Sequence, residues 1–146
     1  MPKHVLLIDD DQDDADLFSD AVGDLGMDII LSHIGDGKKA LEALTERLIQ
    51  TPDMIFLDIN MPNITGWECL REIKKITALQ TISIVMYSTS NLESEGLKAQ
   101  DIGAAAFLTK PNDYEQLKEN LSALFNDLWC RQREVMLGMS DTIGFI

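Results

Sequence analysis

Short continuous apolar runs alternate along the chain with longer stretches in which apolar residues recur every three or four positions. The runs are too continuous for strands with one wet face, so they predict strands covered on both sides, as in a parallel sheet. The predicted strands are residues 5–8, 29–31, 54–57, 82–87 and, more weakly, 104–108.

The stretches between these strands show the three- and four-residue spacing of amphipathic helices. The spaced residues are Phe18, Ala21, Val22 and Leu25; Leu41, Leu44 and Leu48; Trp67, Leu70 and Ile73; and Leu117, Leu121, Leu124 and Leu128. Residues 92–102 form the least periodic helix, and residues 113–135 form a long last helix. Five strand–helix alternations with right-handed crossovers predict an α/β fold with a doubly wound five-stranded parallel sheet and an extended C-terminal helix.

The organisation of the chain is that of one domain. Its 146 residues suffice for one sizeable core, and neither a repeat nor a linker interrupts the alternation. We expect the domain to cover residues 1–136 and treat residues 137–146 as a C-terminal tail.

The charge balance excludes several classes of partner. A formal net charge of −13 repels nucleic-acid phosphates and anionic membranes, so we expect neither nucleic acid nor membrane as a partner. The only continuous apolar stretch near the start, residues 5–8, is too short for a signal peptide or a membrane span, so we expect a cytoplasmic location. Cys69 and Cys130 have no metal-ligand spacing and are interpreted as small core or semi-buried thiols.

Polar residues that could take part in metal binding or catalysis follow the predicted strands. Carboxyl ends of parallel strands meet at one edge of a sheet, so these side chains should converge there. They are Asp9 and Asp10 after the first strand, Asp58 after the third, Ser88 and Thr89 after the fourth, and Lys110 before Pro111 after the fifth.

Three carboxylates in a small volume must be protonated or neutralised, and a hard divalent cation with oxygen ligands neutralises them at neutral pH. Magnesium is the natural candidate, and manganese could substitute for it. The lysine supplies a fixed positive charge for phosphate oxygens, as phosphoryl transfer requires. Asp58, at the centre, is the candidate nucleophile.

The acidic run "DDDQDDAD" has two interpretations. Aspartate is a favoured N-cap and stabilises the positive end of a helix, so the run alone favours a structural role. We therefore assign Asp11, Asp13, Asp14 and Asp16 to a solvated helix start, and only Asp9 and Asp10 to the site.

The loop after the third strand and the lysine–proline pair carry further signals. Met61-Pro62 followed by Gly66 predicts a shaped loop, because proline and glycine fix its backbone. The Lys110–Pro111 bond is either trans or cis, and a cis bond would aim the lysine inward.

Together these motifs resemble the response-regulator receiver (CheY-like) family of two-component signalling. Asp9-Asp10, "LDINMP", "MYST" and "FLTKP" occur in the family's order, and the resemblance spans about residues 4–130. It implies a flavodoxin-like (βα)5 fold. It also implies that Asp58 accepts a phosphoryl group from a sensor histidine kinase or phosphotransfer protein. Asp10, Asp58 and the backbone carbonyl of Asn60 would ligate magnesium, with Asp9 acting largely through water.

The resemblance also implies a switch. Ser88 and Lys110 would hold the phosphoryl oxygens, and Phe107 would turn inward when Ser88 moves toward the phosphate. Tyrosine is common at this position, so phenylalanine could tune the switch differently, and ordinary core packing is the alternative interpretation of Phe107. The expected output is altered binding to an unknown downstream protein, through the surface around the fourth helix and fifth strand.

The end of the chain departs from the family pattern. No output domain follows, so the chain resembles stand-alone receivers paired with phytochrome-type and other sensor kinases. A homodimer or kinase contact is expected at a group of apolar residues, with internal packing and a frayed terminus as the alternative. The group is Leu128, Trp129, Met136, Met139 and Ile143.

Three functional questions stay open at this point. The chain could be a diffusible effector, a phosphorelay intermediate or a phosphate sink. A phosphatase of the haloacid dehalogenase type is a rival, but that family places a D-x-D motif after its first strand, whereas here the candidate nucleophile follows the third strand and residue 60 is Asn. A receiver that has lost phosphorylation is disfavoured, because all the site residues are present.

Overall fold

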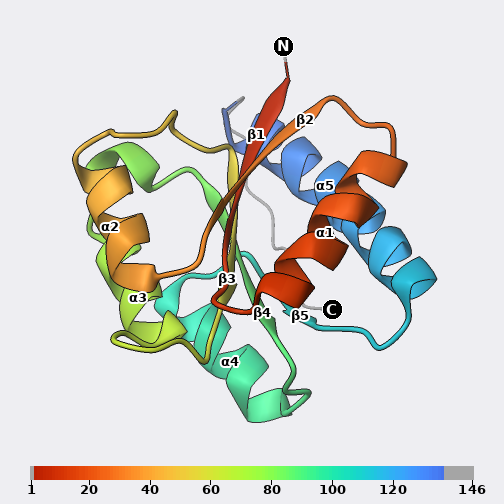
Figure 1. Ribbon diagram of the computed structural model, residues 1–146. Coiled ribbons are helices and arrows are strands. Elements are labelled where there is room, and N and C mark those ends of the chain that lie inside the picture. Colours follow the sequence, from red (N-terminus) through yellow and green to blue (C-terminus); the bar gives the residue numbers. More distant parts are fainter. Residues whose placement is uncertain (1, 137–146) are drawn as a thin grey trace.

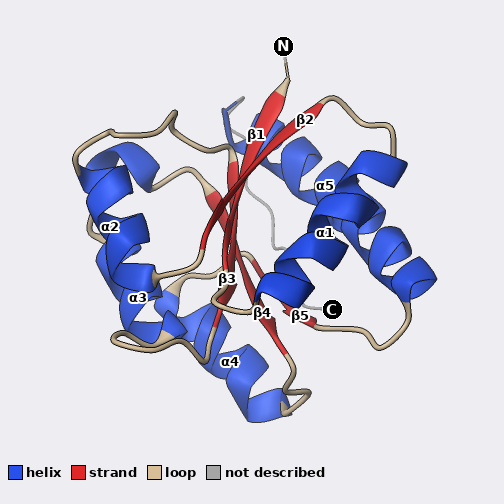
Figure 2. Cartoon of the chain, in the orientation of Figure 1, coloured by secondary structure: helices blue, strands red, loops and turns tan. Residues whose placement is uncertain are grey.

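A central sheet of five parallel strands organises the molecule. The computed structural model describes residues 2–136, with the backbone alone described at residues 130–136. The strands are β1 (Lys3–Ile8), β2 (Ile29–Ile34), β3 (Met54–Asp58), β4 (Ser83–Ser88) and β5 (Ala106–Thr109), in the spatial order β2-β1-β3-β4-β5. Figure 2 shows them as a twisted layer between helices. This is the predicted doubly wound sheet.

Helices cover both faces of the sheet. They are α1 (Gln12–Asp24), α2 (Gly37–Thr45), α3 (Gly66–Lys74), α4 (Glu93–Ile102) and α5 (Tyr114–Met136), with a short 3-10 helix, η1 (Thr77–Leu79), before β4. α1 and α5 lie on one face and α2, α3 and α4 on the other (Figure 1). The predicted extension of the last helix is confirmed, with bounds displaced by one residue.

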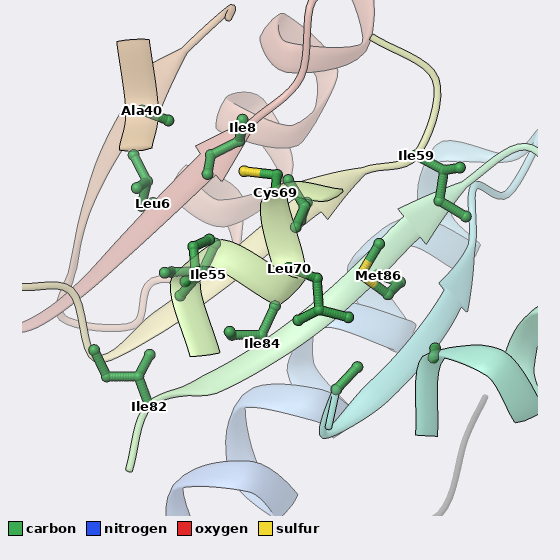
Figure 3. Packing of buried hydrophobic residues seen from close by; sticks show 14 of the residues in the cluster. Leu6, Ile8, Ala40, Ile55, Ile59, Cys69, Leu70, Ile82, Ile84 and Met86 are labelled. Carbon is green, nitrogen blue, oxygen red and sulfur yellow. The ribbon is translucent and has the colours of Figure 1, made fainter. Parts of the chain in front are cut away.

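The central strands are largely apolar because their alternate residues face two different cores. In β1, Leu6 and Ile8 face the helices α2, α3 and α4, where the core is mostly aliphatic (Figure 3). Val5 and Leu7 face α1 and α5, where aromatic rings gather. The central strands are therefore buried on both sides, as the continuous runs predicted.

Two local predictions are wrong. β2 is one of the two edge strands and is not covered on both sides, since Ile30 is 48% exposed. Leu48 does not belong to a helix: α2 ends at Thr45, the backbone at Arg47 has a positive φ of 56°, and Leu48 is 65% exposed. The four-residue spacing between Leu44 and Leu48 is that of a helical turn, although the helix has already ended.

Side-chain caps start the three helices that follow β1, β2 and β3. Asp11 caps α1 by accepting a hydrogen bond from the Asp14 N–H at 3.1 Å. Asp36 accepts from two N–H groups of α2, and Thr65 accepts from the Glu68 N–H at 3.2 Å. These caps satisfy orphan donors and fix where each chain segment leaves the site.

α4 is the most weakly anchored helix, as its poor periodicity predicted. Ala99 is its one buried residue, whereas Leu92, just before it, and Leu97 are 60% and 57% exposed. Gly103 ends the helix with a φ of 113°, a left-handed conformation that favours glycine.

Up to Trp129, the C-terminal helix α5 packs its apolar side chains on the core. Leu128 is fully buried, and the Trp129 ring stacks on Phe125 with centroids 5.0 Å apart. The predicted contact with another chain is therefore wrong for Leu128. The Met136 side chain, Met139 and Ile143 lie outside the described side chains.

Two further predictions concern the thiols and the membrane. Cys69 is fully buried, and burial raises its pKa to about 12, so it is an unreactive core thiol as expected. The Cys130 side chain lies outside the described part. Within residues 2–136, none of the helices combines the length and the apolar character needed to cross a membrane.

Candidate phosphoacceptor and metal site

The predicted site residues meet where the strand order reverses. Asp9 directly follows β1, and Asp58 is the last residue of β3, the neighbouring strand. From this point the chain continues to β2 on one side and to β4 on the other. Such a switch point leaves a crevice at the carboxyl edge of the sheet, which is where ligands bind in open α/β folds.

Three carboxylates converge at this switch point. Oxygen atoms of Asp9, Asp10 and Asp58 all lie within 4.8 Å of one another. Asp9 is fully buried and Asp58 is 6% exposed, whereas Asp10 faces solvent. Two of the carboxylates are therefore buried and the third is exposed, so a small ion or a phosphate could approach the cluster from the side of Asp10.

The electrostatics of Asp58 fit a cation partner. Burial raises the pKa of Asp58 to about 7, and the negative charges of Asp9 and Asp10 add to this effect, although Lys110 opposes it. A divalent cation would remove this penalty. The cluster offers carboxylate oxygens rather than thiols or imidazoles, so the donor set suits Mg²⁺ or Mn²⁺. The role of the Asn60 carbonyl as a further ligand stays a prediction.

The loop after Asp58 fits only a glycine at residue 66. The Gly66 N–H donates to the Ile59 carbonyl at 2.7 Å, which folds α3 back against the end of β3. A Cβ at this position would collide with the Asp58 carbonyl oxygen and lie 2.7 Å from the Ile59 Cα. The shaped loop predicted from Pro62 and Gly66 is thus confirmed, and it holds the Asp58 backbone.

Lys110 reaches into the same cluster. Its Nζ donates to Asp9 Oδ2 and Asp14 Oδ2, both at 2.8 Å, and lies 3.6 Å from Asp58 Oδ1. Its backbone N–H donates to the Ser88 carbonyl at 2.6 Å, which ties the end of β5 to β4. The Lys110–Pro111 bond is trans, so the lysine points inward without a cis bond.

The ammonium group of Lys110 is firmly charged. Burial alone would lower its pKa, but the hydrogen bonds to Asp14 and Asp9 and the nearby carboxylates outweigh burial and raise the pKa above its usual value. Lys110 is therefore a fixed cation with a 9% exposed side chain, as the sequence predicted for this position.

Asp14 is a site residue that the sequence analysis missed. The acidic run predicts a solvated helix start for Asp14, yet its carboxylate binds Lys110. The missed signal is helical spacing: Asp14 precedes the fully buried Phe18 by four residues, so both lie on the face of α1 that meets the sheet. Asp11, Asp13 and Asp16 are exposed, as expected for a helix start.

The carboxylate and the backbone carbonyl of Asp9 both have hydrogen-bonding partners. Asp9 Oδ1 accepts a hydrogen bond from the Asp11 N–H at 2.9 Å, while Oδ2 accepts from Lys110. The exposed His33 ring lies with Nε2 2.7 Å from the Asp9 carbonyl oxygen. Both carboxylate oxygens of Asp9 thus have protein partners.

The two predicted switch residues lie nearby. Ser88 ends β4, is 1% exposed, and its Oγ accepts a hydrogen bond from the Ser90 N–H at 3.2 Å. Phe107 is 4% exposed and packs in the core on the α2–α4 face. Phe107 and Thr109 also line a hollow of about 260 Å³ that reaches Leu97 of α4. Both interpretations of Phe107, switch and core residue, are compatible with this position.

Comparison with known proteins agrees with the geometry. The response regulator receiver domain family matches residues 5–122. The chain is 30% identical over 123 residues to the transcriptional regulatory protein YrkP of Bacillus subtilis, covering 84% of this chain and 49% of YrkP, about half its length. It is 29% identical over 120 residues to the response regulator Rcp1 of Synechocystis, covering 80% of this chain and 82% of Rcp1.

Solved structures share the fold. The phosphorylated cyanobacterial phytochrome response regulator RcpA superimposes with a TM-score of 0.80 at 26% identity, over 88% of this chain and 95% of RcpA. Mn²⁺-bound Rcp1 superimposes with a TM-score of 0.74 at 27% identity, over 84% of this chain and 91% of Rcp1. Borrelia burgdorferi CheY, in a complex with CheX, beryllofluoride and Mg²⁺, superimposes with a TM-score of 0.71 at 25% identity. The match covers 86% of this chain and 90% of CheY. The chain therefore belongs to the response regulator receiver domain family of two-component signalling.

Proposed function

We propose that this chain is a single-domain response regulator. Asp58 accepts a phosphoryl group from a sensor histidine kinase or a phosphotransfer protein, and the phosphorylated protein signals by altered protein binding. The observation that carries the proposal is the meeting of three carboxylates within 4.8 Å of one another beside the Lys110 ammonium.

The proposed transfer needs few protein groups. A carboxylate oxygen of Asp58 forms a bond to phosphorus, the phosphorus–nitrogen bond of the phosphohistidine breaks, and the departing imidazole nitrogen keeps the electron pair and takes up a proton. Lys110, 3.6 Å from Asp58, would balance charge on the phosphoryl oxygens together with the Ser88 hydroxyl. Each chain takes one phosphoryl group, so the protein is a substrate of the transfer rather than a turnover enzyme.

Magnesium is the proposed cofactor, and manganese the substitute. Asp10, Asp58 and the backbone carbonyl of Asn60 would hold the ion, with Asp9 acting through water. When bound, the ion neutralises the carboxylates and the incoming phosphoryl charge. The raised pKa of Asp58 and the all-oxygen donor set support this assignment, as do the metal-bound structures of Rcp1 and CheY.

The proposed output follows from the positions of Ser88 and Phe107. A phosphoryl group on Asp58 would draw Ser88 and the loop of residues 88–94 inward. The hollow between Phe107 and α4 gives the ring room to move, and the weakly anchored α4 would then repack.

Three roles within this class differ in what happens to the phosphate. An effector keeps it, a relay intermediate passes it to a histidine phosphotransfer protein, and a sink loses it by hydrolysis. Incubating the phosphorylated protein with candidate phosphotransfer proteins separates a relay from the other two roles, and the lifetime of the phosphate without a partner separates a sink from an effector. We expect an effector, and transfer to any candidate would instead establish a relay.

The rival functions receive no support from the site. A haloacid dehalogenase-type phosphatase would turn over a generic phosphate ester many times, whereas we expect one labile phosphate per chain. Membership of the receiver family also disfavours that rival. A receiver without phosphorylation would show no mass increase with a small phosphodonor.

The decisive experiment is phosphate-affinity electrophoresis after incubation with acetyl phosphate. We expect a shifted band with magnesium and none with EDTA. Asp58→Asn should abolish the shift, whereas the matched change Asp13→Asn, on the exposed side of α1, should keep it. A shifted band that persists in Asp58→Asn would contradict the proposed phosphoacceptor.

Two proposals about the whole molecule go with this function. The protein acts in the cytoplasm, where histidine kinases present their phosphate.

A homodimer involving the end of the chain is the second proposal: removing residues 137–146 should then lower the mass measured in solution, and an unchanged mass would argue against a role of these residues.

A further inference from the structure

We propose that Asp14 is a releasable partner of Lys110: its carboxylate holds the ammonium in the unphosphorylated protein and gives it up when Asp58 carries a phosphoryl group. This inference rests on the proposed function and assigns Asp14 as a positioning residue. It starts from an asymmetry in the distances. Lys110 Nζ is hydrogen-bonded to Asp9 and Asp14 at 2.8 Å, but lies 3.6 Å from Asp58, beyond hydrogen-bond range.

The two partners of Lys110 differ in the energetic cost of breaking their contact with the ammonium. The Asp9 side chain is fully buried, so without Lys110 its Oδ2 would be a buried charge without a partner. The Asp14 side chain is 31% exposed, so water can replace the ammonium as its partner. A group that competes for Lys110 will therefore displace Asp14 rather than Asp9.

The position of Asp14 is set by the start of α1. Asp11 accepts a hydrogen bond from the Asp14 N–H, and Phe18, one turn later, is buried against the sheet. These two anchors point the Asp14 carboxylate at the site while the carboxylate itself stays free to rotate into water. Asp9 and Asp14 together hold two of the three N–H groups of the Lys110 ammonium. The bond to Asp14 therefore opposes phosphorylation, because it holds the ammonium toward α1 and away from the phosphoryl oxygens.

Beryllofluoride with magnesium, a phosphoryl mimic, gives a direct test on the full chain. Asp14→Asn keeps the shape of the side chain but removes the charge that competes for Lys110. We expect it to bind beryllofluoride about three- to tenfold more tightly than wild type, since one charge-assisted hydrogen bond no longer opposes binding. Asp13→Asn removes the same charge from the same helical turn without touching Lys110, and should bind like wild type.

A double-mutant cycle separates this contact from a general charge effect. In a Lys110→Ala background, Asp14→Asn should change the affinity by less than about twofold, because the contact is already absent. A second readout needs neither metal nor phosphoryl mimic. The ¹⁵N resonance of the Lys110 ammonium, measured in EDTA, should shift in Asp14→Asn and stay in place in Asp13→Asn.

The outcomes distinguish this inference from the proposed function. If wild type binds beryllofluoride and Asp14→Asn binds it equally or more weakly, the inference is overturned and the receiver function stands. An equal gain from Asp14→Asn in the Lys110→Ala background would also overturn it. If wild type does not bind beryllofluoride, the proposed function fails and the inference fails with it.

Discussion

The middle of the sheet and its carboxyl edge are both buried, but they contain opposite kinds of side chains. Along β3, Met54, Ile55, Phe56 and Leu57 are fully buried among apolar neighbours, and the next residue, Asp58, is a buried carboxylate beside two others. Burial of the first four stabilises the fold, whereas burial of Asp58 raises its pKa and opposes its charge. One strand thus supplies stability along most of its length and a reactive, unfavourable charge at its end.

The largest effect should come from the apolar middle. Phe56 contacts Phe18, Phe125 and Tyr87 with ring centroids 4.9, 5.9 and 6.2 Å away. Phe56→Ala should therefore lower the free energy of unfolding by about 3–5 kcal/mol in urea titrations, through lost contacts and a cavity. Leu17→Ala, at a 49% exposed position, should cost less than about 0.5 kcal/mol. Similar losses in the two variants would contradict a packed aromatic core on this face.

The next effect lies where the two regions join. Gly66→Ala brings a Cβ into the Asp58 and Ile59 backbone, which cannot turn away as a side chain would. We expect a loss of roughly 2–3 kcal/mol and slower phosphorylation, because the phosphoacceptor is displaced. Gly23→Ala is the control: no atom lies within 4 Å of a Cβ there, so this helical change should be neutral or stabilising. If Gly66→Ala were as harmless, the close approach would not constrain Asp58.

At the edge itself, removing a charge should stabilise the protein. The folded pKa of Asp58, about 7, exceeds the ordinary value of 3.8. The folded state therefore keeps the proton to higher pH than the unfolded state, and this residue lowers stability progressively as the pH rises from about 4 to about 7. Asp58→Asn should gain about 2 kcal/mol at pH 8 in EDTA, less than the full pKa shift would give, because the buried amide of Asn also loses its contact with water.

The pH dependence checks that prediction. The gain from Asp58→Asn should vanish below about pH 3, where the wild-type carboxyl is protonated in both states. Saturating magnesium at pH 8 should stabilise wild type but not the variant, because a ligand that binds only the folded state raises its stability. A variant less stable than wild type at pH 8 in EDTA would show that the edge carries no charge penalty.

The same comparison explains what the sequence could predict. Continuous apolar runs identified the central strands because both faces of β1, β3 and β4 are buried. The rule failed at β2, because a run of apolar letters does not tell an edge strand from a central one. It also failed at Leu48, where a turn with a left-handed residue, Arg47, ends the helical spacing early.

The site was predictable where position in the chain decides position in space. Asp9, Asp10, Asp58 and Lys110 follow strand ends, so parallel topology alone brings them together. Asp14 was missed because its place in the site depends on the rotation of α1 about its axis, which the Asp11 cap and the buried Phe18 set. An acidic run does not reveal which of its members turns inward.

The smallest effect concerns proton competition with the metal. Magnesium binding at the Asp9–Asp10–Asp58 cluster should release the Asp58 proton at pH values below its pKa of about 7. The apparent dissociation constant should therefore rise about tenfold between pH 8 and pH 6, where one more proton must leave. Isothermal titration calorimetry in buffers of different ionisation enthalpy would measure both the affinity and the proton released. Asp13→Asn, outside the cluster, should keep the same pH profile, and a flat profile for wild type would mean that Asp58 is already ionised when the metal arrives.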